Sequence, residues 1–194
     1  MSATGLQAAG FVQKGNYLTV QLKQHQNFGP SQVRLQVVND QIIRVQATAE
    51  QSFRNKQSLI IVPQEGKANY KVEEQGDRLV ITTAAMRAVL NEATGQITFY
   101  DLKGQVLLNE VAQGGKTFKP FTVPDREIGV DIAKVPEAQK HGWSWRALFD
   151  SPDNEAFYGL GQHQSEELNM KGKNEDLFQY NTKVSVPFVI SNKN

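Results

Sequence analysis

The stretch Gln32-Val33-Arg34-Leu35-Gln36-Val37, followed by Asn39-Asp40 and then Ile42-Ile43-Arg44-Val45, decides the fold class. In each half, apolar and polar residues alternate with a period of two, which is typical of a half-buried antiparallel strand. Asn and Asp favour turns because their side chains bond to the nearby backbone. The stretch therefore predicts a β-hairpin, with one face buried and one face in water.

The same alternation continues on both sides of this hairpin. Strand patterns cover 17–22, 78–83, 86–90, 96–100, 105–108, 142–149 and 184–190, and two of the intervening turns contain Gly95 and Gly104. Strands at intervals of about 8–12 residues are typical of a sandwich or barrel, because a sheet with one apolar face must cover it. The pattern predicts an all-β, antiparallel sandwich. Its expected core includes Val33, Leu35, Val37, Ile43, Val45, Leu79 and Ile81.

Composition excludes several classes of partner. The 194 residues contain 21 Lys and Arg against 20 Asp and Glu, which gives a net charge of +1. No global field attracts nucleic acid or an acidic membrane, and no apolar run is long enough to span a bilayer. The first residues, Met1–Gly5, resemble no signal peptide. A periplasmic or secreted location is nevertheless expected, with a cytoplasmic one as the alternative.

Few residues fit a cofactor or metal site. There are no cysteines, and His25, His141 and His163 lack the spacing of a zinc motif. No nucleophile elbow or phosphate-binding loop is present, so no cofactor is expected. Asp150, Asp153 and Glu155 could supply oxygen ligands for calcium, but a turn stabilised by its own side chains explains them better, and no metal site is predicted.

Trp143 and Trp145 belong to an aromatic-rich segment and share one face of the expected strand. Packing in the core is the favoured interpretation for at least one of them, because aromatic side chains dominate cores. Stacking on sugar rings is the alternative.

One block carries a family resemblance. The segment Glu155-Ala156-Phe157-Tyr158-Gly159-Leu160-Gly161-Gln162 resembles a signature of glycoside hydrolase family 31. The segments 168–173, 179–182 and 186–191 are similar to later motifs of that family in the same order, and the meander 78–110 is similar to an earlier one. Each motif is short, but five in order are specific.

The resemblance implies a galactose-mutarotase-like β-sandwich in front of a (β/α)8 barrel. In this family the barrel supplies two aspartates, a nucleophile and an acid/base, for double displacement with retention. Neither lies in this sequence, so no catalytic residue is predicted and the chain alone is expected to be inactive. Residues 1–194 are interpreted as one N-terminal domain, with residues 1–15 loosely ordered. Its expected partners are the downstream barrel and an oligosaccharide substrate.

The resemblance also implies a loop that reaches the sugar pocket. The expected pocket residues are Gln162, His163, Gln179, Asn181 and Lys183. On an extended segment, Gln179, Asn181 and Lys183 would point the same way. Many α-glucosidases of the family have Asp where this sequence has Lys183, so the implied branch is the α-xylosidases, with α-glucosidase as the alternative.

Two other functions compete with this interpretation. A carbohydrate-binding module would use the face of Trp143 and Trp145. A stand-alone aldose epimerase would need a histidine and a glutamate in one pocket, and none of the histidines lies in a matching motif.

Overall fold

The computed structural model describes residues 10–23, 27–54, 62, 68–113, 115–123, 131–163 and 167–193. The chain divides into two compact units, Met1–Phe149 and Asp150–Asn194. The expectation of one domain over residues 1–194 stays a prediction. Of the first 15 residues, 1–9 lie outside the described ones, and Phe11–Lys14 forms a strand. None of the helices within the described ranges is long and apolar enough to cross a membrane.

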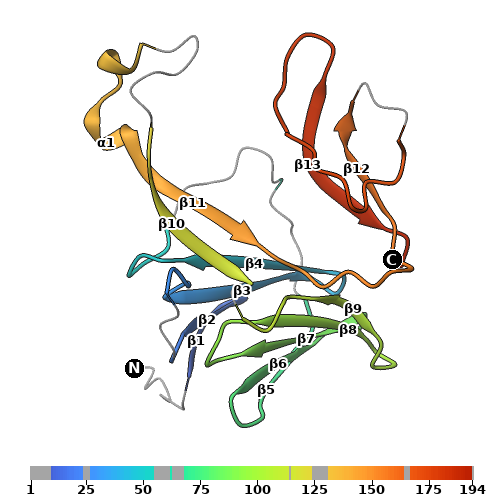
Figure 1. Cartoon of the computed structure of the whole chain (residues 1–194). Coiled ribbons are helices and arrows are strands. Elements are labelled where there is room, and N and C mark those ends of the chain that lie inside the picture. Colours follow the sequence, from blue (N-terminus) through green and yellow to red (C-terminus); the bar gives the residue numbers. More distant parts are fainter. Residues whose placement is uncertain are drawn as a thin grey trace. The chain divides into compact units, whose positions relative to one another are not determined.

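The first sheet is antiparallel, and its four strands follow chain order (Figure 1). They are β1 (Phe11–Lys14), β2 (Tyr17–Gln21), β3 (Gln32–Asn39) and β4 (Ile42–Thr48). The predicted hairpin is β3–β4, in which Leu35 pairs with Val45 and Val37 with Ile43.

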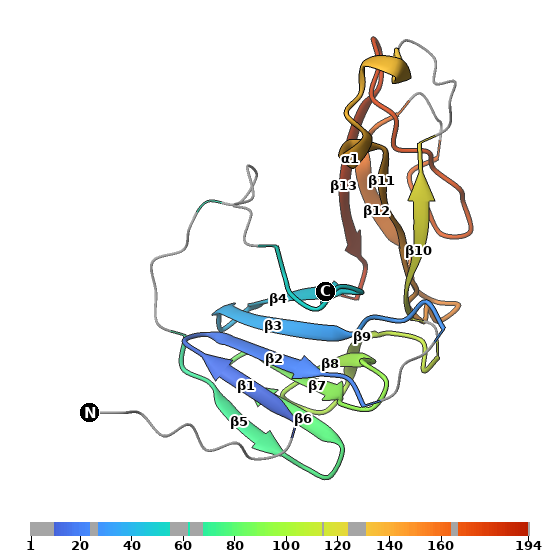
Figure 2. The same ribbon diagram turned by 90° about the vertical axis from the view of Figure 1, so that its left-hand side faces the viewer.

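The second sheet is also an antiparallel meander in chain order. Its strands are β5 (Lys71–Glu74), β6 (Arg78–Thr82), β7 (Met86–Asn91), β8 (Ile97–Asp101) and β9 (Val106–Asn109). Figure 2 shows the two sheets as stacked layers. The predicted antiparallel sandwich is therefore confirmed.

The core lies between these two layers. Alternate residues of each inner strand point into it, as the period of two requires. Its buried members are Leu18, Val20, Leu22, Val33, Leu35, Val37, Leu79, Ile81, Ala88, Leu90 and Ile97. Five of the seven predicted core residues are fully buried, and Ile43 and Val45 pack against the cluster while partly buried. The alternation thus identified the inner face of each sheet.

A buried ion pair lies where the second sheet ends. Glu110 and Lys116 pair with each other, and their side chains are only 3% and 9% exposed. Ile97 N also donates to Glu110 Oε2 at 3.0 Å, and Lys116 Nζ donates to the Gly95 carbonyl at 3.0 Å. Burial raises the pKa of Glu110 and lowers the pKa of Lys116, although each partner opposes the effect on the other.

Two further ribbons complete the structure. In the first unit, β10 (Lys116–Thr122) pairs with β11 (His141–Ala147), and the short helices η1 (Ile132–Lys134) and α1 (Glu137–Lys140) lie between them in the chain. In the second unit, β12 (Phe157–Gln162) pairs with β13 (Val184–Ser191). Both ribbons are antiparallel.

The prediction that Trp143 or Trp145 packs in the core is wrong. The two residues are 43% and 66% exposed on β11. The physical reason is that β10 and β11 form a two-stranded sheet of their own, which extends away from the sandwich layers (Figure 2). Trp143 Nε1 donates a long hydrogen bond, 3.4 Å, to Glu50 Oε1.

Candidate functional site

The Gly-Leu-Gly segment of the family signature forms a bulge in the β12–β13 ribbon. Gly159, Leu160 and Gly161 all have positive φ, at +121°, +66° and +107°. The pairing register shifts between Gly159 and Gly161. A Cβ at Gly159 would lie 2.4 Å from the Phe188 carbonyl oxygen, and one at Gly161 would lie 2.0 Å from that of Val184. Glycine is required at both positions because backbone fills the space of a side chain.

His163 contacts the bulge. Its Nε2 lies 2.7 Å from the Leu160 carbonyl oxygen, and because a carbonyl only accepts, the imidazole nitrogen donates. The buried Nδ1 lies 3.0 Å from Glu175 Oε1, without the geometry of a directional hydrogen bond. The ring therefore connects the bulge to the segment that contains Glu175.

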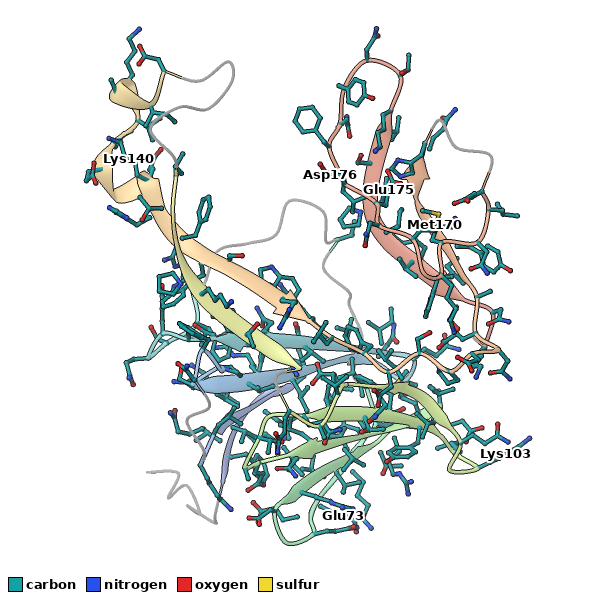
Figure 3. All side chains as sticks on the ribbon, in the orientation of Figure 1. Glu73, Lys103, Lys140, Met170, Glu175 and Asp176 are labelled. Carbon is teal, nitrogen blue, oxygen red and sulfur yellow. The ribbon has the colours of Figure 1, made fainter. Side chains whose placement is uncertain are left out.

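Glu175 also binds Lys183. Lys183 Nζ lies 2.5 Å from Glu175 Oε1 and donates to the Asp176 carbonyl at 2.9 Å. The hydrogen bond from Lys183 holds the pKa of Glu175 below its ordinary value, with His163 adding to the effect and burial opposing it. Figure 3 shows Glu175 and Asp176 on the segment that runs beside β13. His163, Glu175 and Lys183 thus form a set of contacts at the end of the ribbon where residues 163–183 connect β12 to β13, which we call the His163–Glu175–Lys183 tie.

The segment Gln179–Lys183 is not extended, so the geometric argument for its three polar residues is wrong. Lys183 N donates to the Tyr180 carbonyl at 2.7 Å, and residues 181 and 182 form a turn. Because of the turn, successive side chains no longer alternate between two faces, and the Lys183 side chain binds Glu175. Asn181 lies in the turn and Gln179 lies just before it, and both are exposed.

The predicted pocket residues fall into two groups. Gln162, Gln179 and Asn181 are exposed. Gln162, at the end of β12, pairs with Val184, which directly follows the turn in the sequence. His163 and Lys183 are largely covered and bind other parts of the chain. The exposed group can donate to and accept from a hydroxylated ligand, while the covered group positions the turn.

Sequence reasoning missed three residues of this region. Glu175 had no motif, and only the fold places it between His163 and Lys183. The rings of Phe178 and Tyr180 lie 5.9 Å apart at the turn, and both are exposed. Their separation by two residues was the available signal. Such rings can stack on the apolar face of a sugar.

Glu155, at the start of the signature, has a structural contact. It is buried, and its Oε1 accepts a hydrogen bond of 2.6 Å from Ser191 Oγ, which links the start of β12 to the end of β13. Within the described part of the chain, no group of three or more His, Cys, Asp or Glu gathers as metal ligands do. His25 lies outside the described residues, and His141 hydrogen-bonds Glu137 Oε1 at 3.0 Å.

Comparison with known proteins places this region in a family context. Residues 32–194 match the glycosyl hydrolase 31 N-terminal galactose mutarotase-like domain. An uncharacterized family 31 glucosidase of Pseudescherichia vulneris is 26% identical over 168 residues, which are 82% of this chain and 31% of that protein.

Two solved structures are similar across nearly the whole chain. The GH31 α-xylosidase of Xanthomonas citri has a TM-score of 0.79 at 36% identity, over 94% of this chain and 18% of that one. A GH31 α-xylosidase from a soil metagenome, complexed with xylose, has a TM-score of 0.68 at 26% identity, over 95% of this chain and 27% of that one. This chain thus spans less than a third of each of these relatives.

Proposed function

Because the chain belongs to the N-terminal galactose mutarotase-like domains of glycosyl hydrolase family 31, we propose that it serves a retaining α-glycosidase as an accessory domain. It packs on the catalytic barrel and lends the turn Tyr180–Lys183 to the sugar pocket. The preferred substrate is an α-xyloside, with an α-glucoside as the second candidate. The similarity to two α-xylosidases supports this order.

One observation carries the accessory role: strand β13 has exposed apolar side chains within the described part of the chain. Its Val184, Val186, Phe188, Val189 and Ile190 are all exposed. A two-stranded ribbon is marginally stable by itself, and apolar patches of this kind mark interfaces. The barrel of the same protein is the partner proposed for this surface.

The contribution of β13 to docking can be tested by placing a charge on it. Phe188→Asp should leave the unfolding of the isolated 194-residue chain nearly unchanged, because Phe188 is 60% exposed. In the full-length enzyme it should lower the melting temperature by several degrees, since an interface must then bury a carboxylate. Val12→Asp is the control, because Val12 is exposed on β1. Equal effects of both changes in the full-length enzyme would contradict docking through β13.

The pocket role rests on how the turn is held. The His163–Glu175–Lys183 tie fixes a turn whose exposed groups include Asn181, Phe178 and Tyr180. Exposed polar and aromatic groups on a fixed loop suit recognition of a sugar. Because the ammonium of Lys183 only donates, and already donates to Glu175 and to the Asp176 carbonyl, the Lys183 side chain offers no acceptor for the 6-hydroxyl of glucose. That property favours xylose, which lacks the group.

Kinetics of the full-length enzyme test this role. Asn181→Ala should lower kcat/KM about 10- to 100-fold, as expected when a polar contact of ~1–3 kcal/mol is lost. The melting temperature should stay nearly unchanged, because Asn181 is exposed. Asn174→Ala is the matched control, an exposed asparagine outside the turn. The pocket role fails if Asn181→Ala and Gln179→Ala both keep full kcat/KM. The chain alone should hydrolyse neither p-nitrophenyl α-xyloside nor the α-glucoside.

A further inference from the structure

The outer face of the β5–β9 sheet carries a groove of about 360 Å³. Leu79, Ile81, Ala88 and Leu90 point into the core, so their neighbours on β6 and β7 point outward. Arg78, Thr82 and Arg87 therefore line the groove, together with Glu73, Tyr100 and Asp101. Val80 and Val89, which pair with each other, also line it.

Two guanidinium groups in this groove have no carboxylate partner within the described residues. Neither Arg78 nor Arg87 forms an ion pair there. The Arg87 guanidinium lies over the Tyr100 ring, 4.8 Å from its centroid, and its buried Nε has no hydrogen-bond partner. A buried donor is costly to leave unpaired, so its presence points to a ligand or water in the groove.

The two carboxylates of the groove are already engaged. Glu73 Oε1 lies 2.7 Å from Lys71 Nζ, and Asp101 Oδ1 accepts a hydrogen bond of 2.8 Å from Gln105 N. Neither carboxylate forms an ion pair with Arg78 or Arg87, and the remaining carboxylate oxygens can still accept hydrogen bonds. Two arginines and two carboxylates line the groove, so their formal charges balance, and the groove combines guanidinium donors that lack a carboxylate partner among the described residues with acceptors for hydroxyl groups.

We propose that this groove binds the carboxylate of an acidic sugar residue, a hexuronate. A planar guanidinium matches a carboxylate in a two-pronged hydrogen bond. The hydroxyls of Thr82 and Tyr100 and the oxygens of Glu73 and Asp101 would bind the ring hydroxyls. The choice of a sugar rests on the proposed function, whereas the choice of an anion rests on Arg78 and Arg87. All lining residues of the groove belong to the sandwich unit, and none of them belongs to the Tyr180–Lys183 turn.

Titration of the purified chain tests the proposal without any enzyme activity. Followed by NMR, D-glucuronate should bind saturably with a Kd on the order of 1 mM, as its size allows. D-xylose and acetate should each bind at least about tenfold more weakly. Arg78→Gln and Arg87→Gln should each weaken glucuronate binding about 10- to 100-fold. Arg87→Lys should also weaken it, because an ammonium lacks the planar fork.

Lys103→Gln is the control, because Lys103 is an exposed cation on the turn after β8 and does not line the groove (Figure 3). Melting temperatures confirm that each variant is folded. Absence of saturable binding, or full binding by both arginine variants, would overturn the site. Acetate binding as tightly as glucuronate would overturn the sugar, and xylose binding as tightly would overturn the anion. The pocket role of the Tyr180–Lys183 turn is tested by kcat/KM, whereas the glucuronate site is tested by binding to the chain alone. Either hypothesis can therefore be contradicted without affecting the other.

Discussion

Gly95 and Gly104, two turn glycines of the second sheet, allow the cost of a steric clash at Cβ to be separated from the cost of a positive φ. Gly95 and Gly104 have similar positive φ, +77° and +88°. A Cβ at Gly95 would lie 2.8 Å from Leu22 Cδ1 and 3.2 Å from Val33 Cγ2, both in the core. A Cβ at Gly104 would meet nothing within 4 Å. Alanine at either position incurs the same backbone penalty, and only alanine at Gly95 also crowds the core.

The expected magnitudes follow from these two contributions. A positive φ costs a non-glycine residue about 1–2 kcal/mol, and an extra carbon in a packed core costs about 1–3 kcal/mol. The entropic gain from removing a glycine, about 0.4–1 kcal/mol, is common to both variants. Gly104→Ala should therefore destabilise the protein by up to about 1.5 kcal/mol, and Gly95→Ala by about 1–3 kcal/mol more.

Urea unfolding, followed by a signal from the sandwich unit, measures both free energies. Equal destabilisation of Gly95→Ala and Gly104→Ala, within about 0.5 kcal/mol, would refute the argument from close approach. A double-mutant cycle adds a direct test. Leu22→Val removes the carbon atom nearest to the new Cβ, so the pair Gly95→Ala and Leu22→Val should cost less than the sum of the single changes.

Three further predictions concern burial and charge. Lys116→Met removes the lysine partner of the buried Glu110, so the pKa of that carboxyl, already raised by burial, should rise further. The folded state then binds the proton more tightly than the unfolded state, and stability against urea should rise as pH falls toward 5. A stability that does not change with pH would contradict this. Leu35→Ala should cost about 2–5 kcal/mol because Leu35 is fully buried, while Val12→Ala on exposed β1 should cost under ~0.5 kcal/mol in the same unfolding assay. The pKa of Glu175 is lowered by its lysine partner, so the stability that Glu175 gives to the Tyr180–Lys183 turn is present above pH 4.5 and is lost as pH falls through the lowered pKa. NMR chemical shifts of the turn should follow this titration, and Glu175→Gln should abolish it.

Alternation of apolar and polar residues was sufficient to predict the sandwich and most of its core. Val33, Leu35 and Val37 are buried because a strand turns every second side chain to the same face, and no distant residue is needed to know this. The structure explains why the family signature contains two glycines. Gly159 and Gly161 are required where the backbone of β13 approaches too closely for a Cβ.

Only the tertiary structure decided which faces are covered and which charges meet. Trp143 and Trp145 share a face, as their spacing predicts, but β10 and β11 form a two-stranded sheet of their own, and both rings are exposed within the described part of the chain. Pairing of β12 with β13 brings His163 and Lys183 to the same end of the ribbon, where both contact Glu175. A side chain's face depends on its own strand, whereas burial and charge pairing depend on residues that are distant in the sequence, and that is why the tie was not predictable from the sequence.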